Sequence, residues 1–312
     1  MNKPNLSIVI PLLNEEDNID KLYVELMAVL KPMSCKYEIL FIDDGSTDES
    51  FIRILQIKKL DPNVRGISFS RNFGHQAALA AGIAKAKGDV IISMDADLQH
   101  PPSLIPDLYA KHLEGFEIVN TKRIETEDAG QIKKITSTVF YKIINSFSDI
   151  RIEPGAADFR LITKKVAEAF LEIKEKDRFT RGLVSWMGFS QAFIIYNAPS
   201  RTAGVSKYTF SKMLKFAISG ITSFSSKPLR LALYSGFMVS LIALVYSIFA
   251  IISNIQGKTI PGWTSILLSV LFIGGIQLIT LGIFGEYLGK IFIEIKNRPL
   301  YIINKTSDDI EI

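Results

Sequence analysis

Apolar and polar positions follow two alternating periods along the first 125 residues of the chain. Short apolar runs rich in β-branched residues are typical of buried strands, and apolar residues recurring every three or four positions indicate amphipathic helices. The predicted strands are 6–10, 37–42, 64–69, 90–92 and 116–119. The predicted helices between them are 18–30, 49–60, 76–87 and 103–114. This alternation predicts an α/β fold with a mostly parallel sheet covered on both faces.

Two later segments, 231–253 and 264–285, contain no charged residue. Each is long enough to cross the roughly 30 Å hydrocarbon core of a bilayer as a helix. Two such runs in succession favour two transmembrane helices over a buried helix hairpin. Basic residues flank the pair outside, whereas the connecting loop 254–263 holds only Lys258. The positive-inside rule therefore places both termini and the N-terminal domain in the cytoplasm, on the inner (plasma) membrane. The apolar stretch 6–13 is too short for a signal peptide.

Charge is distributed unevenly along the chain. The net charge is +4 overall, but no acidic residue occurs between Asp177 and Glu286. Eight basic residues precede the first uncharged run: Arg178, Arg181, Arg201, Lys207, Lys212, Lys215, Lys227 and Arg230. Topogenic charge accounts for the last two, whereas the others favour anionic headgroups or a phosphorylated ligand at the membrane face. The single Cys35 excludes an internal disulfide, and we expect no nucleic-acid partner.

Two further segments, 132–147 and 210–224, each have one apolar helical face. Such helices pack on a core or lie in the membrane interface, and the basic second segment favours the interface because it leads into an apolar run.

The predicted organisation has four parts. They are a catalytic domain at 1–206, an amphipathic juxtamembrane helix at 207–229, a transmembrane hairpin at 230–290 and a cytoplasmic tail at 291–312.

Polar clusters follow four of the predicted strands: 11–16, 43–46, 70–74 and 95–100. Ligands of open α/β sheets bind beyond the carboxyl ends of the strands, so these clusters predict one site. Asp95 and Asp97, one residue apart, suit Mg²⁺ or Mn²⁺ shared with substrate phosphates. A simple strand-ending turn is the alternative. No Gly-x-Gly-x-x-Gly or Walker A motif is present, so a bound diphosphate requires another means of neutralisation.

These clusters resemble the motifs of a family 2 glycosyltransferase. The motifs are Ser7-Ile8-Val9-Ile10-Pro11 with Asn14-Glu15-Glu16, Asp43-Asp44-Gly45-Ser46-Thr47-Asp48, Ser70-Arg71-Asn72-Phe73-Gly74 and Asp95-Ala96-Asp97-Leu98-Gln99. Segment 201–208, Arg-Thr-Ala-Gly-Val-Ser-Lys-Tyr, is similar to the signature of the polyprenyl-phosphate branch. That branch includes dolichol-phosphate mannose synthases and bactoprenol glucosyltransferases, and the two closing apolar runs resemble the latter.

The resemblance implies a GT-A (Rossmann-like) fold and inverting transfer of a sugar from a nucleotide diphosphate to a lipid phosphate. It also implies roles for individual residues. Those expected at the donor nucleotide sugar are Pro11, Asn14, Glu16, Asp43, Asp44, Arg71, Asn72, Asp95 and Gln99. Those expected at the metal, Mg²⁺ or Mn²⁺, are Asp95, Asp97 and Gln99. Asp158 matches the position of the catalytic base; its alternative is a loop carboxylate paired with Arg160.

The acceptor phosphate requires cationic partners, for which we expect Arg123, Arg201 and Lys207. A phosphate monoester is largely dianionic at neutral pH, so it needs little help from a base. The expected substrates are UDP-glucose and undecaprenyl phosphate at the cytoplasmic face. GDP-mannose, UDP-N-acetylglucosamine and UDP-aminoarabinose remain open as donors.

Two other classes of function are alternatives. A processive polysaccharide synthase requires a Gln-x-x-Arg-Trp motif, which the sequence lacks. A lipid- or nucleotide-sugar-binding protein, or a non-catalytic flippase subunit, stays open. Gly285 and Gly289 form a small-xxx-small pair, which favours a homo-oligomer, with a tetramer among the options.

Overall fold

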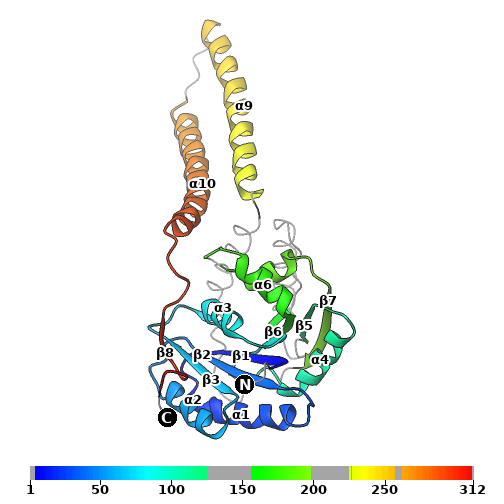
Figure 1. Cartoon of the computed structure of the whole chain (residues 1–312). Coiled ribbons are helices and arrows are strands. Elements are labelled where there is room, and N and C mark those ends of the chain that lie inside the picture. Colours follow the sequence, from blue (N-terminus) through cyan, green and yellow to red (C-terminus); the bar gives the residue numbers. More distant parts are fainter. Residues whose placement is uncertain are drawn as a thin grey trace. The chain divides into compact units, whose positions relative to one another are not determined.

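Strands and helices alternate through the N-terminal part of the computed structural model (Figure 1). The structure describes residues 4–124, 156–176, 178–197, 225, 227–256 and 262–310. The chain divides into two units. The first comprises 1–142, 150–209 and 298–312, and the second comprises 143–149 and 210–297.

The described residues of the first unit form an eight-stranded sheet in the order β7-β5-β6-β4-β1-β2-β3-β8. The strands are β1 (Leu6–Leu12), β2 (Tyr37–Asp43), β3 (Val64–Phe69), β4 (Val90–Ser93), β5 (Ile118–Ile124), β6 (Ala156–Thr163), β7 (Gln191–Asn197) and β8 (Ile303–Thr306). Parallel pairing joins β4, β1, β2 and β3, and also β5 and β7. β6 and β8 pair antiparallel with their neighbours. The predicted α/β fold with a mostly parallel sheet is therefore confirmed.

Helices cover both faces of this sheet (Figure 1). They are α1 (Glu16–Leu30), α2 (Ser50–Leu60), α3 (His75–Lys85), the 3₁₀ turn η1 (Pro102–Leu104), α4 (Ile105–Leu113), α6 (Lys164–Glu172) and α7 (Thr180–Trp186). The apolar faces of α1, α2 and α4 share one core with alternate residues of the strands, such as Ile8 and Phe41. On the other face, α3 packs against β1 so closely that a Cβ at Gly82 would lie 2.1 Å from Val9 Cγ1.

Strand register brings the polar strand ends to one edge of the sheet. Leu12 of β1 is paired with Asp43 of β2, and Asp43 in turn with Ser68 of β3. On the other side, Ser93 ends β4 beside β1. Because β6 runs antiparallel to β4, its first residues reach the same edge, where Arg160 is paired with Ser93. The end of β5 also lies there, since Lys122 is paired with Ala156 at the start of β6.

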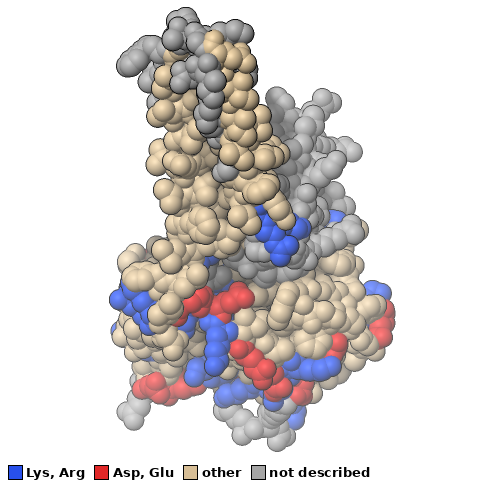
Figure 2. Space-filling model, turned by 90° about the horizontal axis from the view of Figure 1, so that it is seen from above, with Lys and Arg blue, Asp and Glu red and all other residues tan. Residues whose placement is uncertain are grey.

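The second unit contains two long helices, α9 (Lys227–Ile255) and α10 (Trp263–Ile295), which pack against each other. They contain both predicted apolar runs. The space-filling view shows a broad surface over them without charged side chains (Figure 2). Within the described residues, one segment, Phe272–Ile295, is long and apolar enough to span a membrane by length and composition. Crossing of the membrane by both helices is not confirmed and stays a prediction.

Candidate active site

A cavity of about 270 Å³ opens at the carboxyl edge of the sheet. Its walls come from the ends of β1, β2 and β4 and from the loop before α3. Among the predicted donor and metal residues, Pro11, Asp44, Asn72, Asp95 and Asp97 line it. Seven further residues complete the lining: Leu12, Leu13, Glu15, Gly74, His75, Ala78 and Ala96. The four polar clusters thus meet in one place, as the pattern of strands predicts.

The Asp95-Ala96-Asp97 turn is held by its own neighbours. The Asp95 backbone N–H donates to His100 Nδ1 at 2.9 Å, and buried His100 stacks on Phe159. The Gln99 N–H donates to Asp97 Oδ1 at 3.1 Å. These bonds fix the turn so that both carboxylates line the cavity. His100 therefore has a structural role in this turn.

Asp95 Oδ1 is buried and has no hydrogen-bond donor among the described residues. Burial raises the pKa of Asp95, and the neighbouring His100 and His75 only partly oppose this. The pKa of Glu15 is also raised, by burial and by the charges of Asp97, Asp48 and Asp95. Glu15, Asp95 and Asp97 therefore share one partly buried space. A cation coordinated by their oxygens would reduce the repulsion between the carboxylates and give Asp95 Oδ1 a partner.

The residues present fit a divalent cation held jointly with substrate. Within the described part of the chain, no group of three or more His, Cys, Asp or Glu side chains is arranged to hold a metal. An all-protein cage is thus not seen there. Two carboxylates that leave room for phosphate oxygens are the donor set that Mg²⁺ and Mn²⁺ accept.

Asp44 joins the cavity to the loop 70–74. Its two carboxylate oxygens accept the backbone N–H groups of Phe73, at 2.7 Å, and Gly74, at 2.8 Å. Burial raises the pKa of Asp44, and these two hydrogen bonds oppose the rise. The carboxylate therefore fixes the loop that carries Asn72 into the cavity wall.

Gly45 allows this loop to approach β2. Its φ is +74°, and a Cβ there would lie 2.5 Å from the carbonyl carbon of Arg71. Only glycine combines this conformation with this contact.

We expect Gly45→Ala to lower the free energy of unfolding by more than about 1 kcal/mol, because a non-glycine residue with positive φ already costs that much. Gly115→Ala is the matched control: its φ is +105°, but nothing lies within 4 Å of its Cβ position. Thermal unfolding of both variants in detergent measures the difference. Equal losses would show that the approach of Arg71 is unimportant.

Several predicted donor residues lie outside the lining of this cavity. Asn14, with φ of +55°, accepts the Thr47 N–H at 2.9 Å and so joins two loops. The Glu16 carboxylate accepts the Glu49 N–H, 2.8 Å away at the start of α2. The Asp43 carboxylate accepts from Ser46 N–H and the Ser68 hydroxyl. The Arg71 guanidinium lies 4.1 Å from the ring centre of Phe73. These contacts hold the loops next to the cavity, and any direct donor contact by the four residues stays a prediction.

Asp158 forms a buried ion pair with two arginines. Its carboxylate accepts from Arg160 at 2.9 Å and from Arg181 at 3.1 Å. Burial alone would raise the pKa of Asp158, but the charges of Arg181 and Arg160 together hold it well below its usual range. The carboxylate is therefore ionised at neutral pH. A carboxylate held in this way is a weak base but a rigid anchor for two cations.

His75, at the start of α3, lies between the carboxylates of Asp95 and Asp158. Its Nε2 is 3.5 Å from Asp95 Oδ1 and 3.9 Å from Asp158 Oδ2. The sequence motifs assign no individual role to Glu15, and His75 lies outside the four predicted clusters. The position of His75 depends on how α3 packs on the sheet, and no local sequence motif indicates that packing.

Gln99 and Arg123 contact each other at the far side of the motif. The Arg123 guanidinium donates to Gln99 Oε1 at 3.1 Å. The residue predicted at the metal, Gln99, and one predicted at the acceptor phosphate, Arg123, are therefore in direct contact. Arg201 and Lys207, the other expected acceptor residues, lie outside the described residues.

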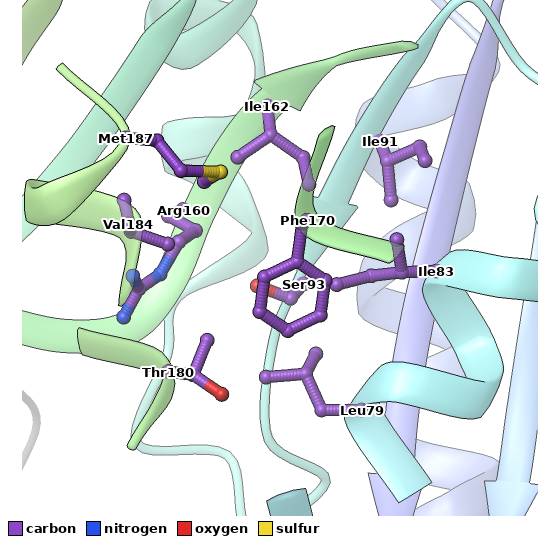
Figure 3. Close-up of a pocket in the computed structure, with 10 residues that line it drawn as sticks. All are labelled: Leu79, Ile83, Ile91, Ser93, Arg160, Ile162, Phe170, Thr180, Val184 and Met187. Atoms are coloured by element: carbon purple, nitrogen blue, oxygen red, sulfur yellow. The ribbon is translucent and has the colours of Figure 1, made fainter. Parts of the chain in front are cut away.

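Arg160 also lines a second cavity (Figure 3). Its volume is about 10 Å³, and apolar side chains make up most of its walls, with Ser93, Arg160 and Thr180 as polar members. Such a volume is close to that of a single water and is too small for a sugar or a nucleotide. The larger cavity is therefore the candidate substrate site.

Residues 7–171 match the family described as Glycosyl transferase family 2. The chain is 42% identical over 306 residues to the SfII prophage-derived bactoprenol glucosyl transferase of Shigella flexneri, covering 96% of this chain and 98% of that protein. It is 41% identical over 300 residues to an uncharacterized glycosyltransferase of Synechocystis, covering 96% and 94%.

Among solved structures, glucosyl-3-phosphoglycerate synthase from Mycobacterium tuberculosis matches over 70% of this chain and 79% of its own, with 18% identity and a TM-score of 0.46. The family assignment rests on the sequence matches, which extend over more than half of the chain. The chain belongs to glycosyl transferase family 2.

Proposed function

We propose that this protein is an inverting glycosyltransferase that moves glucose from UDP-glucose to undecaprenyl phosphate at the cytoplasmic face of the membrane. The observation that carries the proposal is the cavity at the sheet edge, lined by Asp95 and Asp97. The relative named bactoprenol glucosyl transferase supports the choice of sugar and lipid. GDP-mannose, UDP-N-acetylglucosamine and UDP-aminoarabinose are the competing donors.

Asp95 and Asp97 would hold Mg²⁺ or Mn²⁺ together with the diphosphate of the donor, and Gln99 is the third candidate ligand. When bound, such a cation acts as a Lewis acid that stabilises the departing diphosphate. The Oδ1 atom of Asp95, which accepts no hydrogen bond from the described residues, supports this assignment. For Gln99 to contribute its amide oxygen, the hydrogen bond from Arg123 would have to share that atom or give way.

Asp44, Pro11 and Asn72 would form the donor side of the cavity, where carboxylate and amide groups suit ribose hydroxyls or a base N–H. Asn14, Glu16, Asp43 and Arg71 would support this wall from behind.

In the transfer step, an oxygen of the lipid phosphate attacks C1 of the sugar from the side opposite the diphosphate. The new C1–O bond forms as the bond from C1 to the diphosphate oxygen breaks, and the electron pair leaves with the nucleoside diphosphate. The acceptor is already largely dianionic at neutral pH, so no strong base is required. We propose that Asp158 holds Arg160 and Arg181 in place instead of removing a proton, because its pKa is held low.

Arg123, Arg201 and Lys207 are our candidates for the acceptor phosphate, where they would offset the repulsion between two bound anions. Both α9 and α10 would cross the membrane, with the catalytic domain and both termini in the cytoplasm. The basic segment before α9 would lie at the headgroups. A homo-oligomer is part of the same proposal.

The test of donor choice is a panel of radiolabelled nucleotide sugars offered to the purified protein with undecaprenyl phosphate and Mn²⁺. We expect label from UDP-glucose to enter the lipid phase at least about tenfold faster than from the other donors, as expected for a site that pairs with each hydroxyl of its sugar. Faster transfer from another sugar would replace glucose in the proposal without changing the reaction class.

A further inference from the structure

The C-terminal residues that follow α10 form part of the sheet edge nearest the loop 70–74. β8 pairs antiparallel with β3, with Ile67 opposite Thr306 and Phe69 opposite Ile303. The Ser70 N–H donates to the Ile302 carbonyl at 3.0 Å. The first residue of the loop 70–74 is therefore hydrogen-bonded to the residue that precedes β8.

Aromatic packing continues this connection toward the cavity. The ring of Tyr301 stacks on Phe69 with a centroid distance of 4.9 Å and an interplanar angle of 7°. Phe69 is 2% exposed and meets Phe73 edge-on at 5.9 Å. The Phe73 N–H then donates to Asp44, which lines the cavity. A continuous series of contacts thus joins Tyr301 to the donor wall.

The far end of the segment is anchored separately. Ser307 is 1% exposed, and its hydroxyl accepts the Gly66 N–H at 2.8 Å. Asp308 pairs with Lys58 at 2.6 Å and with Arg65 at 3.3 Å. Residues 301–308, named here the tail segment, are therefore fixed at both ends to β3 and α2.

We propose that the tail segment is a positioning element of the donor site, with Tyr301 as its central residue. The tail segment and Asp44 hold the loop 70–74 from opposite sides, and this loop presents Asn72 and Gly74 to the cavity. The proposal rests on the proposed function, since it assigns that loop to the nucleotide sugar. It predicts that loosening Tyr301 weakens donor binding and leaves acceptor binding and the chemical step largely unchanged.

The test compares full-length Tyr301→Ala with Tyr301→Phe, which keeps the stacked ring. Tyr109→Ala is the matched control, because Tyr109 is a partly buried tyrosine that packs on the core of the same unit from α4. We expect KM for UDP-glucose to rise about tenfold in Tyr301→Ala, as expected for loss of a stacked aromatic contact and its buried area. The kcat and the KM for undecaprenyl phosphate should stay within about twofold, and Tyr301→Phe and Tyr109→Ala should behave like the unchanged protein.

Hydrogen exchange gives a second readout that does not depend on activity. We expect the Ser70 amide to exchange about tenfold faster in Tyr301→Ala, since its acceptor lies beside residue 301. Asp308→Asn, which weakens the far anchor at a half-exposed position, should accelerate the same amide to a smaller extent. Unchanged exchange and unchanged donor KM in Tyr301→Ala would overturn the proposal. If the unchanged protein transfers no sugar, the proposed function fails, whereas exchange at Ser70 still decides whether the tail segment holds the loop.

Discussion

Asp97→Asn is expected to lower kcat/KM about 100- to 1,000-fold, because a Lewis-acid cation supplies several kcal/mol and each 1.4 kcal/mol is tenfold in rate. The substitution removes the charge that would bind the cation. It keeps Oδ1 as an acceptor for the Gln99 N–H, so the turn should stay folded. Rates of sugar transfer to undecaprenyl phosphate, measured over a Mn²⁺ titration, give the effect.

Asp107→Asn is the control for this variant. Asp107 is an exposed aspartate in the first turn of α4, so its charge contributes only a small interaction with the helix dipole. We expect its activity to stay within about twofold of the unchanged protein. Calorimetric titration with Mn²⁺ and UDP should show weaker Mn²⁺ binding only in Asp97→Asn. Normal metal binding and full activity in that variant would remove Asp97 from the metal site.

Asp158→Asn is expected to lower the free energy of unfolding by about 3–5 kcal/mol, the usual cost of leaving a buried charge without its partner. Arg160 is 3% exposed and Asp158 is 9% exposed, so water cannot replace the lost charge. Glu114→Gln is the matched control. Its ion pair with Lys111 is exposed, and its loss should cost less than about 1 kcal/mol.

The stability difference between the unchanged protein and Asp158→Asn should depend on pH. The folded pKa of Asp158 lies below that of an unfolded aspartate, about 3.9. The difference is therefore complete above about pH 4 and decreases as the pH falls further and the folded carboxylate becomes protonated. Chemical denaturation in detergent from pH 7 downward measures it. A difference that is absent at pH 7 would show that the ion pair does not stabilise this unit.

The first four strands could be predicted because their sequence pattern matches their burial. β1 to β4 are buried parallel strands with continuous apolar runs, and each predicted one overlaps the observed strand closely. β6 was not predicted because Asp158 and Arg160 interrupt its apolar pattern, and their charges are compensated only in three dimensions. β8 was not predicted because its four residues, Ile303–Thr306, are mostly polar. Its pairing partner lies more than 230 residues away in sequence.

The sheet edge that carries the candidate site could be predicted from the sequence, but the orientation of individual side chains at that edge could not be predicted. Adjacent residues at a strand end point in different directions, so of Asp43 and Asp44 only Asp44 lines the cavity. At the start of α1, Glu15 lines the cavity and Glu16 does not. Spacing does not distinguish the members of such pairs. The contact of Gln99 with Arg123 is likewise set by β5, which reaches the edge through its antiparallel pairing with β6.

Transfer of a sugar to a lipid phosphate is tested by comparing two acceptors. Purified protein is given radiolabelled UDP-glucose and Mn²⁺ with either undecaprenyl phosphate or undecaprenol, and the lipid phase is analysed by mass spectrometry. We expect one glucose joined through a phosphodiester in the first reaction, and no product in the second or after chelation of the metal. Product from undecaprenol, or no product from undecaprenyl phosphate with any nucleotide sugar, would contradict it.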